Sequence, residues 1–361
     1  MVIIFCFLFS CSSQEKEIIS TNGSTSVSSN NNSNQSSAPV VYSEWLIPKE
    51  EIFDGGPGKD GIPSIDSPVF KRALDKRVND YLSDDDLVVG IQVGGIYKAY
   101  PHKILNWHEI VNDKFSDFKV TLSYCPLTGT ALAWKYAHKG ENVVFGVSGL
   151  LYNSNLILYD RTTDSNWSQL KMECVNGELL NEMPEELDLV EMPWGEWKKK
   201  YPFSLVLSEE QGFDRNYLEY PYGPYLDIDD FLLFPVNPVN KSYPNKERMH
   251  AIIENNISIM FRFDSFVNGN AIKKVFFNKT FLIVGNKDII KSFELSENQK
   301  EKEYSFMLNG TTFFVDEDGN EWSVFGEAIN GDRKGDKLKN AKSVTGFWFS
   351  LAAFYPDPEV Y

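Results

Sequence analysis

Two hairpin patterns constrain the fold of this chain more than any other feature of its sequence. Residues 87–100 place apolar strands on either side of Gly94 and Gly95, and residues 249–261 do the same around Asn255 and Asn256. Two-residue turns of glycine or asparagine between such strands are typical of antiparallel hairpins, because these residues accept the positive φ angles of the turn. The chain is therefore expected to build antiparallel sheets.

Short strand-like runs continue through the first half of the chain. Their β-branched and aromatic residues predict strands at 119–124, 131–136, 142–148 and 155–159. The segment from Pro101 to Trp107 predicts a short helix, since proline suits the first turn of a helix. The long spacing of β-α-β units is missing, so the expected fold class is α+β, predominantly antiparallel β, and not a doubly wound sheet.

A recurring arrangement of tryptophans accompanies the two hairpins. Trp167 and Trp322 each follow an acidic turn and precede a serine, and Trp194 and Trp348 each lie shortly before a Tyr-Pro pair. These matches predict two diverged copies of one β-rich unit, at residues 42–208 and 209–361. Chance similarity among aromatic hairpins is the alternative explanation.

The amino-terminal residues have the pattern of an export signal with a lipidation site. Val2 to Phe9 are apolar except for Cys6, and the run ends in Leu8-Phe9-Ser10-Cys11, which resembles a bacterial lipobox. We expect residues 1–10 to be a lipoprotein signal peptide. The Cys11 thiol would then carry a lipid that anchors the exported protein to a membrane of the bacterial cell envelope, at the outer membrane or on its periplasmic face. The apolar run is too short to span a bilayer, and no Lys or Arg precedes it, which departs from the usual signal.

Residues 11–41 differ sharply in composition from the chain that follows. They are rich in Ser, Asn, Thr and Gln and contain few apolar side chains. Such a segment cannot offset its ordering entropy by burial, and as a flexible coil it would span roughly 30 Å on average. We expect it to be a tether between the lipid anchor and the folded part.

The charge balance bears on the partners of the folded part. The chain has 35 Lys and Arg against 51 Asp and Glu, which gives a net charge of -16. A surface of this sign repels the phosphates of nucleic acids, so no nucleic-acid partner is expected.

Cys125 and His108 are the strongest candidates for a functional site. Cys125 ends a predicted strand and is followed by Pro126, which ends the strand ladder at a place where functional residues accumulate. A thiolate there could act as a catalytic nucleophile with His108 as its base, or both side chains could bind a soft transition metal such as copper or zinc. A buried structural cysteine is the alternative, and a disulfide between Cys125 and Cys174 is a further one.

Other side chains near these segments could bind a small ligand. Arg161 could hold a carboxylate or phosphate, although an ion pair with Asp160 or Asp164 would equally explain it. Ser148 lies in an incomplete nucleophile-elbow pattern and could simply end a strand. The full set of candidate ligand-binding residues is Trp107, Glu109, Asp113, Tyr124, Ser148, Arg161 and Trp167.

Several of these segments together resemble a known family. They are Gly90 to Gly95, Lys98 to Pro101, Trp107 to Asp113, Tyr124 to Leu127, Ser148 to Leu151, Tyr159 to Arg161, Trp167 to Gln169, and the closing Phe347 to Phe349 and Phe354 to Pro356. In this combination the chain resembles the bacterial domain of unknown function 3179 family (DUF 3179) over about residues 46 to 358. The resemblance implies no activity. Members typically show Cys-Pro-Leu-Cys, whereas this chain has Thr128 at the second cysteine, which weakens any dithiol redox role.

Three functions remain open from the sequence. The chain could be a lipid-anchored protein that binds a metal or small ligand at Cys125 and His108, and this is the reading we favour. It could instead be an extracytoplasmic thiol-dependent enzyme, with Cys125 as nucleophile and His108 as base. It could also be a structural or interaction module in which Cys125 is buried and inert.

Overall fold

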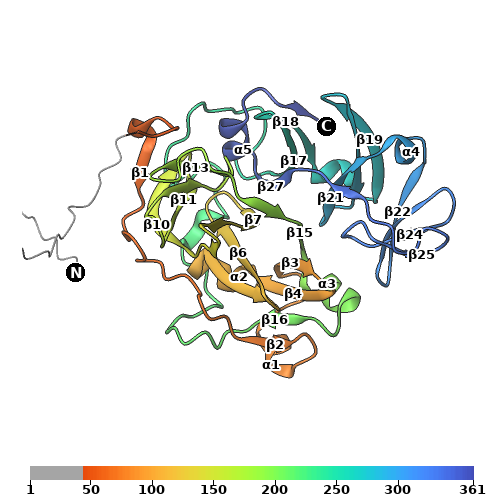
Figure 1. The fold of residues 1–361 in the computed structure, drawn as a ribbon, viewed down its shortest axis with the longest axis horizontal. Helices are drawn as coiled ribbons and strands as arrows, with labels where there is room; N and C mark the ends of the chain where they lie inside the picture. Colours follow the sequence, from red (N-terminus) through yellow and green to blue (C-terminus); the bar gives the residue numbers. More distant parts are fainter. Residues whose placement is uncertain (1–43) are drawn as a thin grey trace, which may run out of the picture. The chain divides into compact units, whose positions relative to one another are not determined.

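Antiparallel strands dominate residues 44–361, the part of the chain that the computed structural model describes (Figure 1). Strands take 43% of the residues and helices 13%, which confirms the expectation of a predominantly antiparallel β fold with few helices. None of the helices within residues 44–361 is both long enough and apolar enough to cross a membrane.

The strands of the first half form three sheets, with one further two-stranded hairpin. The first sheet has the order β1 (Ile52–Asp54), β10 (Phe145–Tyr152), β11 (Asn155–Asp160), β12 (Asn166–Ser168) and β13 (Glu173–Asn176). The second has the order β14 (Glu185–Leu187), β7 (Thr130–Lys135), β6 (Phe118–Cys125) and β5 (Ile110–Phe115). The third has the order β15 (Leu189–Pro193), β3 (Leu87–Val93), β4 (Ile96–Pro101), β16 (Leu205–Leu207) and β2 (Phe70–Arg72), and the hairpin is β8 (Ala137–His138) with β9 (Glu141–Asn142).

The strands of the second half form three four-stranded sheets. One has the order β27 (Ser343–Phe347), β17 (Arg248–Glu254), β18 (Ile257–Arg262) and β28 (Glu359–Val360). Another has the order β19 (Asn270–Phe276), β20 (Lys279–Gly285), β21 (Ile290–Leu295) and β26 (Lys339–Asn340). The last has the order β22 (Tyr304–Asn309), β23 (Thr312–Asp316), β24 (Glu321–Trp322) and β25 (Ala328–Asn330).

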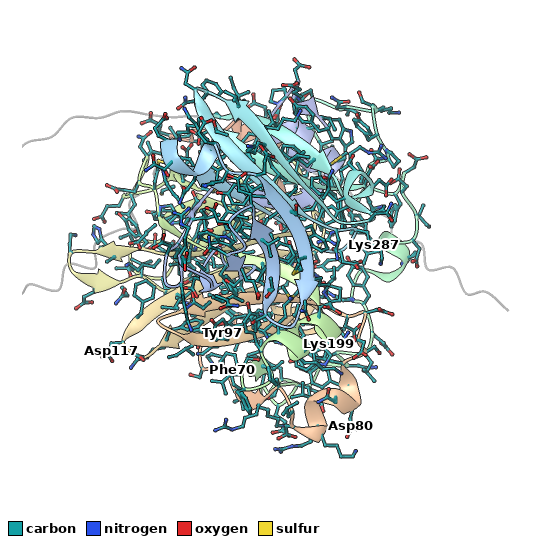
Figure 2. The ribbon with its side chains drawn as sticks, turned by 90° about the vertical axis from the view of Figure 1, so that its right-hand side faces the viewer. Phe70, Asp80, Tyr97, Asp117, Lys199 and Lys287 are labelled. Carbon is teal, nitrogen blue, oxygen red and sulfur yellow. The ribbon has the colours of Figure 1, made fainter. Side chains whose placement is uncertain are left out.

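Short helices connect or cover the strands. The α-helices are α1 (Lys76–Tyr81), α2 (His102–His108), α3 (Trp194–Lys200), α4 (Glu297–Lys300) and α5 (Trp348–Phe354), and the 3-10 helices are η1 (Lys49–Glu51), η2 (Gly223–Tyr225) and η3 (Phe263–Phe266). The helix predicted at 101–107 is α2, which begins one residue later. Figure 2 shows Asp80 of α1 and Asp117 of the turn between β5 and β6 at the periphery.

The strand predicted at 142–148 is displaced along the chain. The observed strand, β10, starts at Phe145 and continues to Tyr152, with a register shift between Val147 and Leu150. Gly149 lies in this irregular stretch with φ +81°, and a Cβ atom there would come within 2.8 Å of the Gly58 carbonyl oxygen. A bulge bends the strand at this point, so alternation of side chains could not mark its end from the sequence.

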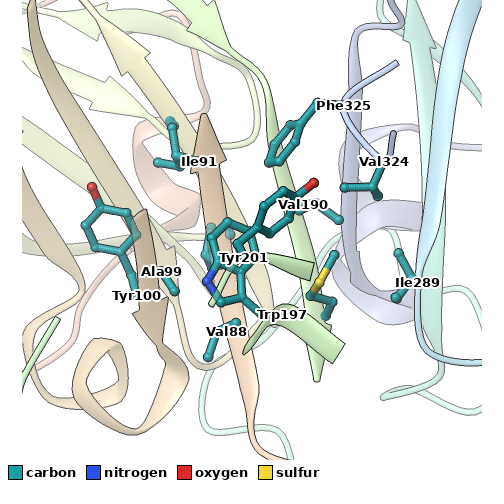
Figure 3. Close-up of a cluster of buried hydrophobic side chains, with 14 of the residues drawn as sticks. Val88, Ile91, Ala99, Tyr100, Val190, Trp197, Tyr201, Ile289, Val324 and Phe325 are labelled. Atoms are coloured by element: carbon teal, nitrogen blue, oxygen red, sulfur yellow. The ribbon is translucent and has the colours of Figure 1, made fainter. Parts of the chain in front are cut away.

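One apolar core draws on both halves of the chain. Val88, Val190 and Trp197 of the first half share a buried cluster with Ile289 and Phe325 of the second (Figure 3). Residues 42–361 accordingly group as one unit by their contacts, although the two hairpins lie far apart in sequence. The sheets of the two halves therefore depend on each other for burial.

A substitution at Gly90 tests how tightly this core is packed. A Cβ atom at Gly90 would come within 1.9 Å of the Trp197 ring, which is fully buried. We expect Gly90→Ala to lower the free energy of unfolding by about 1–3 kcal/mol, because extra atoms in a packed core force side chains to shift. Urea denaturation measures this. Adding Trp197→Leu, which frees space beside the new methyl group, should make Gly90→Ala less harmful than it is beside Trp197; equal effects in both backgrounds would contradict the argument.

Candidate functional site

Cys125 lies at the last position of β6 and is enclosed by protein. Its side chain is 1% exposed, and its Sγ is 3.6 Å from the carbonyl oxygen of Ser154. Burial, together with the nearby carboxyl of Glu109, raises the pKa of the thiol to about 11. A thiol in this environment is protonated near neutral pH and is a poor nucleophile and a poor metal ligand.

His108 is equally enclosed, at the end of α2. Its Nδ1 donates to the carbonyl oxygen of Pro63 at 2.7 Å, and its Nε2 accepts from the Tyr217 hydroxyl at 2.7 Å. Burial lowers the pKa of the ring. Within residues 44–361 no hydrogen bond joins His108 to Cys125, and no group of three His, Cys, Asp or Glu side chains is arranged to hold a metal. Both ring nitrogens are already occupied in this arrangement.

Glu109 is the charged residue that the structure brings close to Cys125. It follows α2 with φ +56°, a conformation that is unfavourable for a side chain of this kind and that the surrounding fold must hold in place. The residue is buried, and its Oε1 accepts a hydrogen bond from the Tyr222 hydroxyl at 2.9 Å. Burial raises the pKa of this carboxyl to about 7, partly opposed by that hydrogen bond.

A segment from the connection between the halves covers these residues. We call residues 217–225 the tyrosine segment, because four of its nine residues are tyrosines. Its contacts reach the sequence-predicted site directly: Tyr217 to His108, Trp107 Nε1 to Glu219 O at 3.0 Å, Tyr220 to Pro126 O at 3.4 Å, Tyr222 to Glu109, and Tyr225 to Leu127 O at 2.8 Å. The segment therefore closes the region around Cys125. The cluster of tyrosines was visible in the sequence, but the sequence did not show which residues they would pack against.

The pKa of Glu109 gives a pH-dependent prediction. Since the folded carboxyl titrates at about 7 and its ordinary value is 4.5, the folded protein holds the extra proton between these pH values. The free energy of unfolding should therefore fall as the pH rises through this window, with a slope of up to about 1.4 kcal/mol per pH unit from this group. Glu109→Gln should remove that slope. Tyr222→Phe removes a hydrogen-bond donor to the carboxylate, so it should raise the pKa of Glu109 further and extend the slope to higher pH.

Urea denaturation at several pH values between 4.5 and 8 measures these slopes. The comparison is between wild type and Glu109→Gln, so that contributions from other titrating groups cancel. A difference between the two that stays constant with pH would show that Glu109 has an ordinary pKa.

Asp113 and Tyr124 have structural partners. Asp113 forms a buried ion pair with Lys98 at 2.8 Å and accepts a hydrogen bond from the Tyr100 hydroxyl at 2.5 Å. The Tyr124 ring packs 4.4 Å from the His102 ring, between the centroids. Both side chains are buried, and neither reaches His108 by a hydrogen bond within residues 44–361.

Arg161 lies at the surface and pairs with a distant part of the chain. Its guanidinium makes two hydrogen bonds of 2.9 Å to the carboxylate of Asp60, which confirms an ion pair but with another partner than Asp160 or Asp164. Asp164 pairs instead with Lys59. Asp60 could not be identified as the partner of Arg161 from the sequence, because the two residues are 101 positions apart and the fold brings them together.

Ser148 and Trp167 also serve the sheet. The Ser148 hydroxyl hydrogen-bonds to the Ile157 carbonyl beside the β10 bulge. Trp167 is fully buried, and its Nε1 donates to Asp160 at 3.1 Å. Trp322 makes the corresponding bond to Asp316 at 3.2 Å. The acidic turns that precede both tryptophans thus satisfy the indole nitrogens.

Thr128 stands where the dithiol pattern has its second cysteine, and its side chain has hydrogen-bond partners within the protein. Thr128 is fully buried, and its hydroxyl bonds to Thr130 at 2.8 Å and accepts from Asn155 at 3.0 Å. Cys125 and Cys174 are both free thiols, so the disulfide considered between them is not formed. The proposed lipidation site, Cys11, lies outside the described residues.

A cavity of about 290 Å³ lies where the sheets of the two halves meet. Its walls come from β7, β14 and β15 on one side and from β17, β21, β26 and β27 on the other. This volume is at the lower end of the range for ligand pockets, so the cavity would suit a small molecule. Five of these strands, β7, β15, β17, β21 and β27, are labelled in Figure 1.

The cavity is lined by charged side chains that the fold buries. Lys291 is 5% exposed and bonds to Asp188 and to the Leu189 carbonyl at 2.8 Å. His250 bonds to Ser292 at 2.9 Å, and burial, reinforced by Lys291, lowers the pKa of its ring to about 3. His250 is therefore neutral near pH 7.

Glu191 is the most deeply buried carboxylate of this cavity. Its side chain is 3% exposed, and its Oε2 lies 3.1 Å from His102 Nε2 and 3.7 Å from the Arg248 guanidinium. Its Oε1 has no hydrogen-bond partner among the described residues, and the same holds for Oδ2 of Asp188 and Oδ1 of Asn340. Buried oxygens without partners are rare in folded proteins and call for an explanation.

None of these cavity residues was predicted from the sequence. A signal was present, because Glu191 and Lys291 are charges inside apolar strand-like runs. Charged residues at buried strand positions indicate ion pairs or sites. The sequence could not show that the two runs face the same space.

Comparison with known proteins gives one match. The family model described as "Protein of unknown function (DUF3179)" matches residues 59–358, which is most of the chain. No curated protein and no solved structure matches this chain.

Proposed function

Because this chain belongs to the DUF3179 family, whose description assigns no function, we propose a function from the geometry: the protein binds a small polar ligand in the cavity between its two halves. The observation that carries this proposal is that three polar side chains buried by the fold, Glu191, His250 and Lys291, line this cavity. A few fixed polar groups in the wall of a pocket are what orient a small ligand.

The proposal moves the binding site away from Cys125 and His108. Those side chains are packed under the tyrosine segment and are engaged with protein partners, whereas the cavity is open space lined by polar groups. A metal at Cys125 and His108 finds no third ligand in the described part of the chain, which leaves a small molecule as the better supported ligand.

We further propose that the binding protein is held in the bacterial cell envelope by a lipid on Cys11, behind a tether of residues 11–41. The lipobox-like sequence and the polar composition of these residues support this. Mass determination of the protein from membranes tests it: Cys11→Ser should abolish the lipid mass and release the protein, while Cys6→Ser should change neither.

We also propose that the halves are diverged copies of one unit. The order β15, β3, β4, β16 parallels the order β27, β17, β18, β28, and in each case the last strand pairs parallel to its neighbour. The indole bonds of Trp167 and Trp322 to preceding aspartates give further support. Under this proposal the cavity lies between equivalent elements.

A thiol-dependent enzyme is the second candidate. The observation that favours it is the buried Glu109 carboxyl, which lies close enough to raise the pKa of the Cys125 thiol and itself titrates at about 7. In this version Cys125 is the nucleophile and Glu109, in place of His108, accepts its proton once the tyrosine segment has moved. The alkylation experiment in the Discussion tests it.

The cavity proposal is tested by thermal unfolding of the full chain with a panel of small amines, acids, alcohols and sugars. A compound present at 100 times its Kd should add about 2.7 kcal/mol to the free energy of unfolding. Ala341→Phe and Ser343→Phe replace small, half-buried residues of the cavity wall, and we expect both to abolish the stabilisation. Ala271→Phe, at a half-buried position outside the cavity lining, is the matched control and should retain it.

Two results would reject the proposal. One is the absence of any stabilising compound for the wild type. The other is stabilisation that survives in both wall variants, since the ligand would then be bound elsewhere.

A further inference from the structure

We propose that the ligand of this cavity is a short peptide in an extended conformation, bound through the free backbone groups of strands β15 and β27. This inference rests on the proposed function, and it specifies the chemical class that the cavity would select. It is carried by three observations: which parts of the sheets line the cavity, which backbone groups of those parts are unpaired, and how the charges of the lining balance.

Two walls of the cavity are formed by edges of sheets. Residues 186–191 and residues 340–345 each line the cavity without a gap. Side chains alternate between the two faces of a strand, so the face of a sheet would contribute only every second residue of a strand. The two runs contain parts of β14, β15, β26 and β27, and each of these strands is the outermost one of its sheet in the described part of the chain. Edges of four sheets therefore meet at one cavity.

The hydrogen bonds of β27 show which of its backbone groups point away from its sheet. In an antiparallel ladder, alternate residues direct both N–H and C=O toward the neighbouring strand, and the residues between them direct both away from it. Phe347 N donates to Thr128 O at 2.8 Å, so its backbone groups point away from β17. By alternation, those of Ser343 and Thr345 point away as well. Within residues 44–361, no backbone group of another strand or loop bonds to them on that side.

Strand β15 presents backbone groups in the same way. Lys291 Nζ donates to Leu189 O at 2.8 Å, so this carbonyl points away from β3. Pro193, four residues later, has no N–H to give to the ladder, which agrees with this alternation. The N–H of Leu189 and both backbone groups of Glu191 therefore point outward too, and no backbone group of the described residues bonds to them there.

Unpaired strand edges are surfaces to which extended peptides add as a further strand. A peptide residue carries one N–H and one C=O, so it can meet both kinds of free group on β15 and β27. Ser343 and Thr345 are two residues apart, which is about 7 Å along a strand. A space of about 290 Å³ therefore suits a peptide of roughly two or three residues.

The charges of the lining favour a ligand without net charge. Each carboxylate of the lining has a cation beside it: Glu186 lies 3.2 Å from Lys342, Asp188 pairs with Lys291, and Glu191 lies 3.7 Å from Arg248. Burial keeps His250 neutral near pH 7. The backbone of a peptide is polar and uncharged, so it can bond to the strand edges without disturbing these ion pairs.

The test adds two blocked dipeptides to the panel of compounds named above, acetyl-dialanine N-methylamide and acetyl-divaline N-methylamide. Each is compared with an ester analogue, in which an oxygen replaces the N–H between the two residues. The ester keeps the size of the dipeptide and lacks one donor. Binding to the full chain is measured by calorimetry at pH 7. We expect at least one dipeptide to bind, and its ester to bind about fivefold or more weakly.

Two variants of Thr345 address the strand edge itself. Thr345→Pro removes an outward N–H that takes no part in the β17 ladder, and proline is tolerated on edge strands in such positions. Thr345→Val keeps this N–H. Both changes remove the hydroxyl that lies 3.2 Å from His250, so the difference between them reports on the backbone group. We expect Thr345→Pro to bind the dipeptide about tenfold more weakly than Thr345→Val. The melting temperature of each variant without ligand shows whether it is folded.

The outcomes separate this inference from the proposed function. If neither dipeptide binds while another compound of the panel does, the peptide class is wrong and the proposed function stands. If an ester binds as tightly as its dipeptide, or if a folded Thr345→Pro variant binds like Thr345→Val, the strand edges do not hold the ligand and the inference is wrong. If no compound binds, both are rejected. Dipeptide binding that needs both N–H groups and is lost in Ala341→Phe supports both.

Discussion

Asp113→Ala is expected to lower the free energy of unfolding by about 3–5 kcal/mol, because it leaves a buried lysine without its counter-charge. Lys98 and Asp113 are 7% and 5% exposed at their side chains, and their atoms approach to 2.8 Å. Without the carboxylate, Lys98 Nζ would keep one hydrogen-bond acceptor among the described residues, the carbonyl oxygen of Lys114 at 2.9 Å, and its contacts with the Phe70 and Phe115 rings. Tyr100 would lose the acceptor of its hydroxyl as well.

A matched exposed ion pair provides the control. Asp80 pairs with Lys76 on α1 at the surface, where both side chains are more than half exposed (Figure 2). Asp80→Ala should therefore change the free energy of unfolding by no more than about 1 kcal/mol. The double change of Lys98→Met with Asp113→Leu should recover much of the loss, because it removes both buried charges. Equal effects of Asp113→Ala and Asp80→Ala in urea denaturation would show that the Lys98 pair is solvated.

Alkylation of Cys125 in the native protein is expected to be slower than in the unfolded chain by about two orders of magnitude or more at pH 8. The thiolate is the reacting form, and a pKa of about 11 leaves little of it at this pH. The low exposure of the side chain, 1%, slows the reagent further. Peptide mass spectrometry after iodoacetamide treatment measures Cys125 separately from the other cysteines.

A cysteine introduced at Asp117 serves as an internal reference. Asp117 lies in the turn between β5 and β6 with a fully exposed side chain, so Asp117→Cys should react at the ordinary rate of a free thiol (Figure 2). Native alkylation of Cys125 at a rate close to that of the reference would favour the enzyme. Slow native alkylation with full reactivity after unfolding would favour a structural thiol. In the enzyme, Tyr222→Ala should expose Cys125 and accelerate its alkylation, because Tyr222 covers Glu109.

The strands were predictable because their signals are local. Gly94 and Gly95 have φ angles of +57° and +79°, as the turn of an antiparallel hairpin requires, and the observed strands lie on either side of them. Asn255 and Asn256 adopt +51° and +61° in the second hairpin. Such turns depend on the residue types at a few neighbouring positions, so they can be predicted without knowledge of distant contacts.

The candidate site was less predictable because its contacts are long-range. The sequence indicated residues 107–109 and 125–127 as parts of one candidate site, but the tyrosine segment that covers them lies about 100 residues away. Burial is the main cause of the raised pKa of Cys125, and the local sequence does not show which distant segments will bury a residue. The cavity depends in the same way on Glu191 and Lys291, which are 100 residues apart.

Under the proposed function, the ladders on the two sides of the cavity have a consequence for how its ligand selectivity can change. Glu191 stands opposite Val89 in one ladder, and Thr345 stands opposite His250 in the other. Three of these positions, all except Val89, line the cavity, yet they belong to separate sheets. Mutations can therefore alter the chemistry of one wall while the opposite wall keeps its packing, so that related proteins could acquire different ligands without rebuilding the fold.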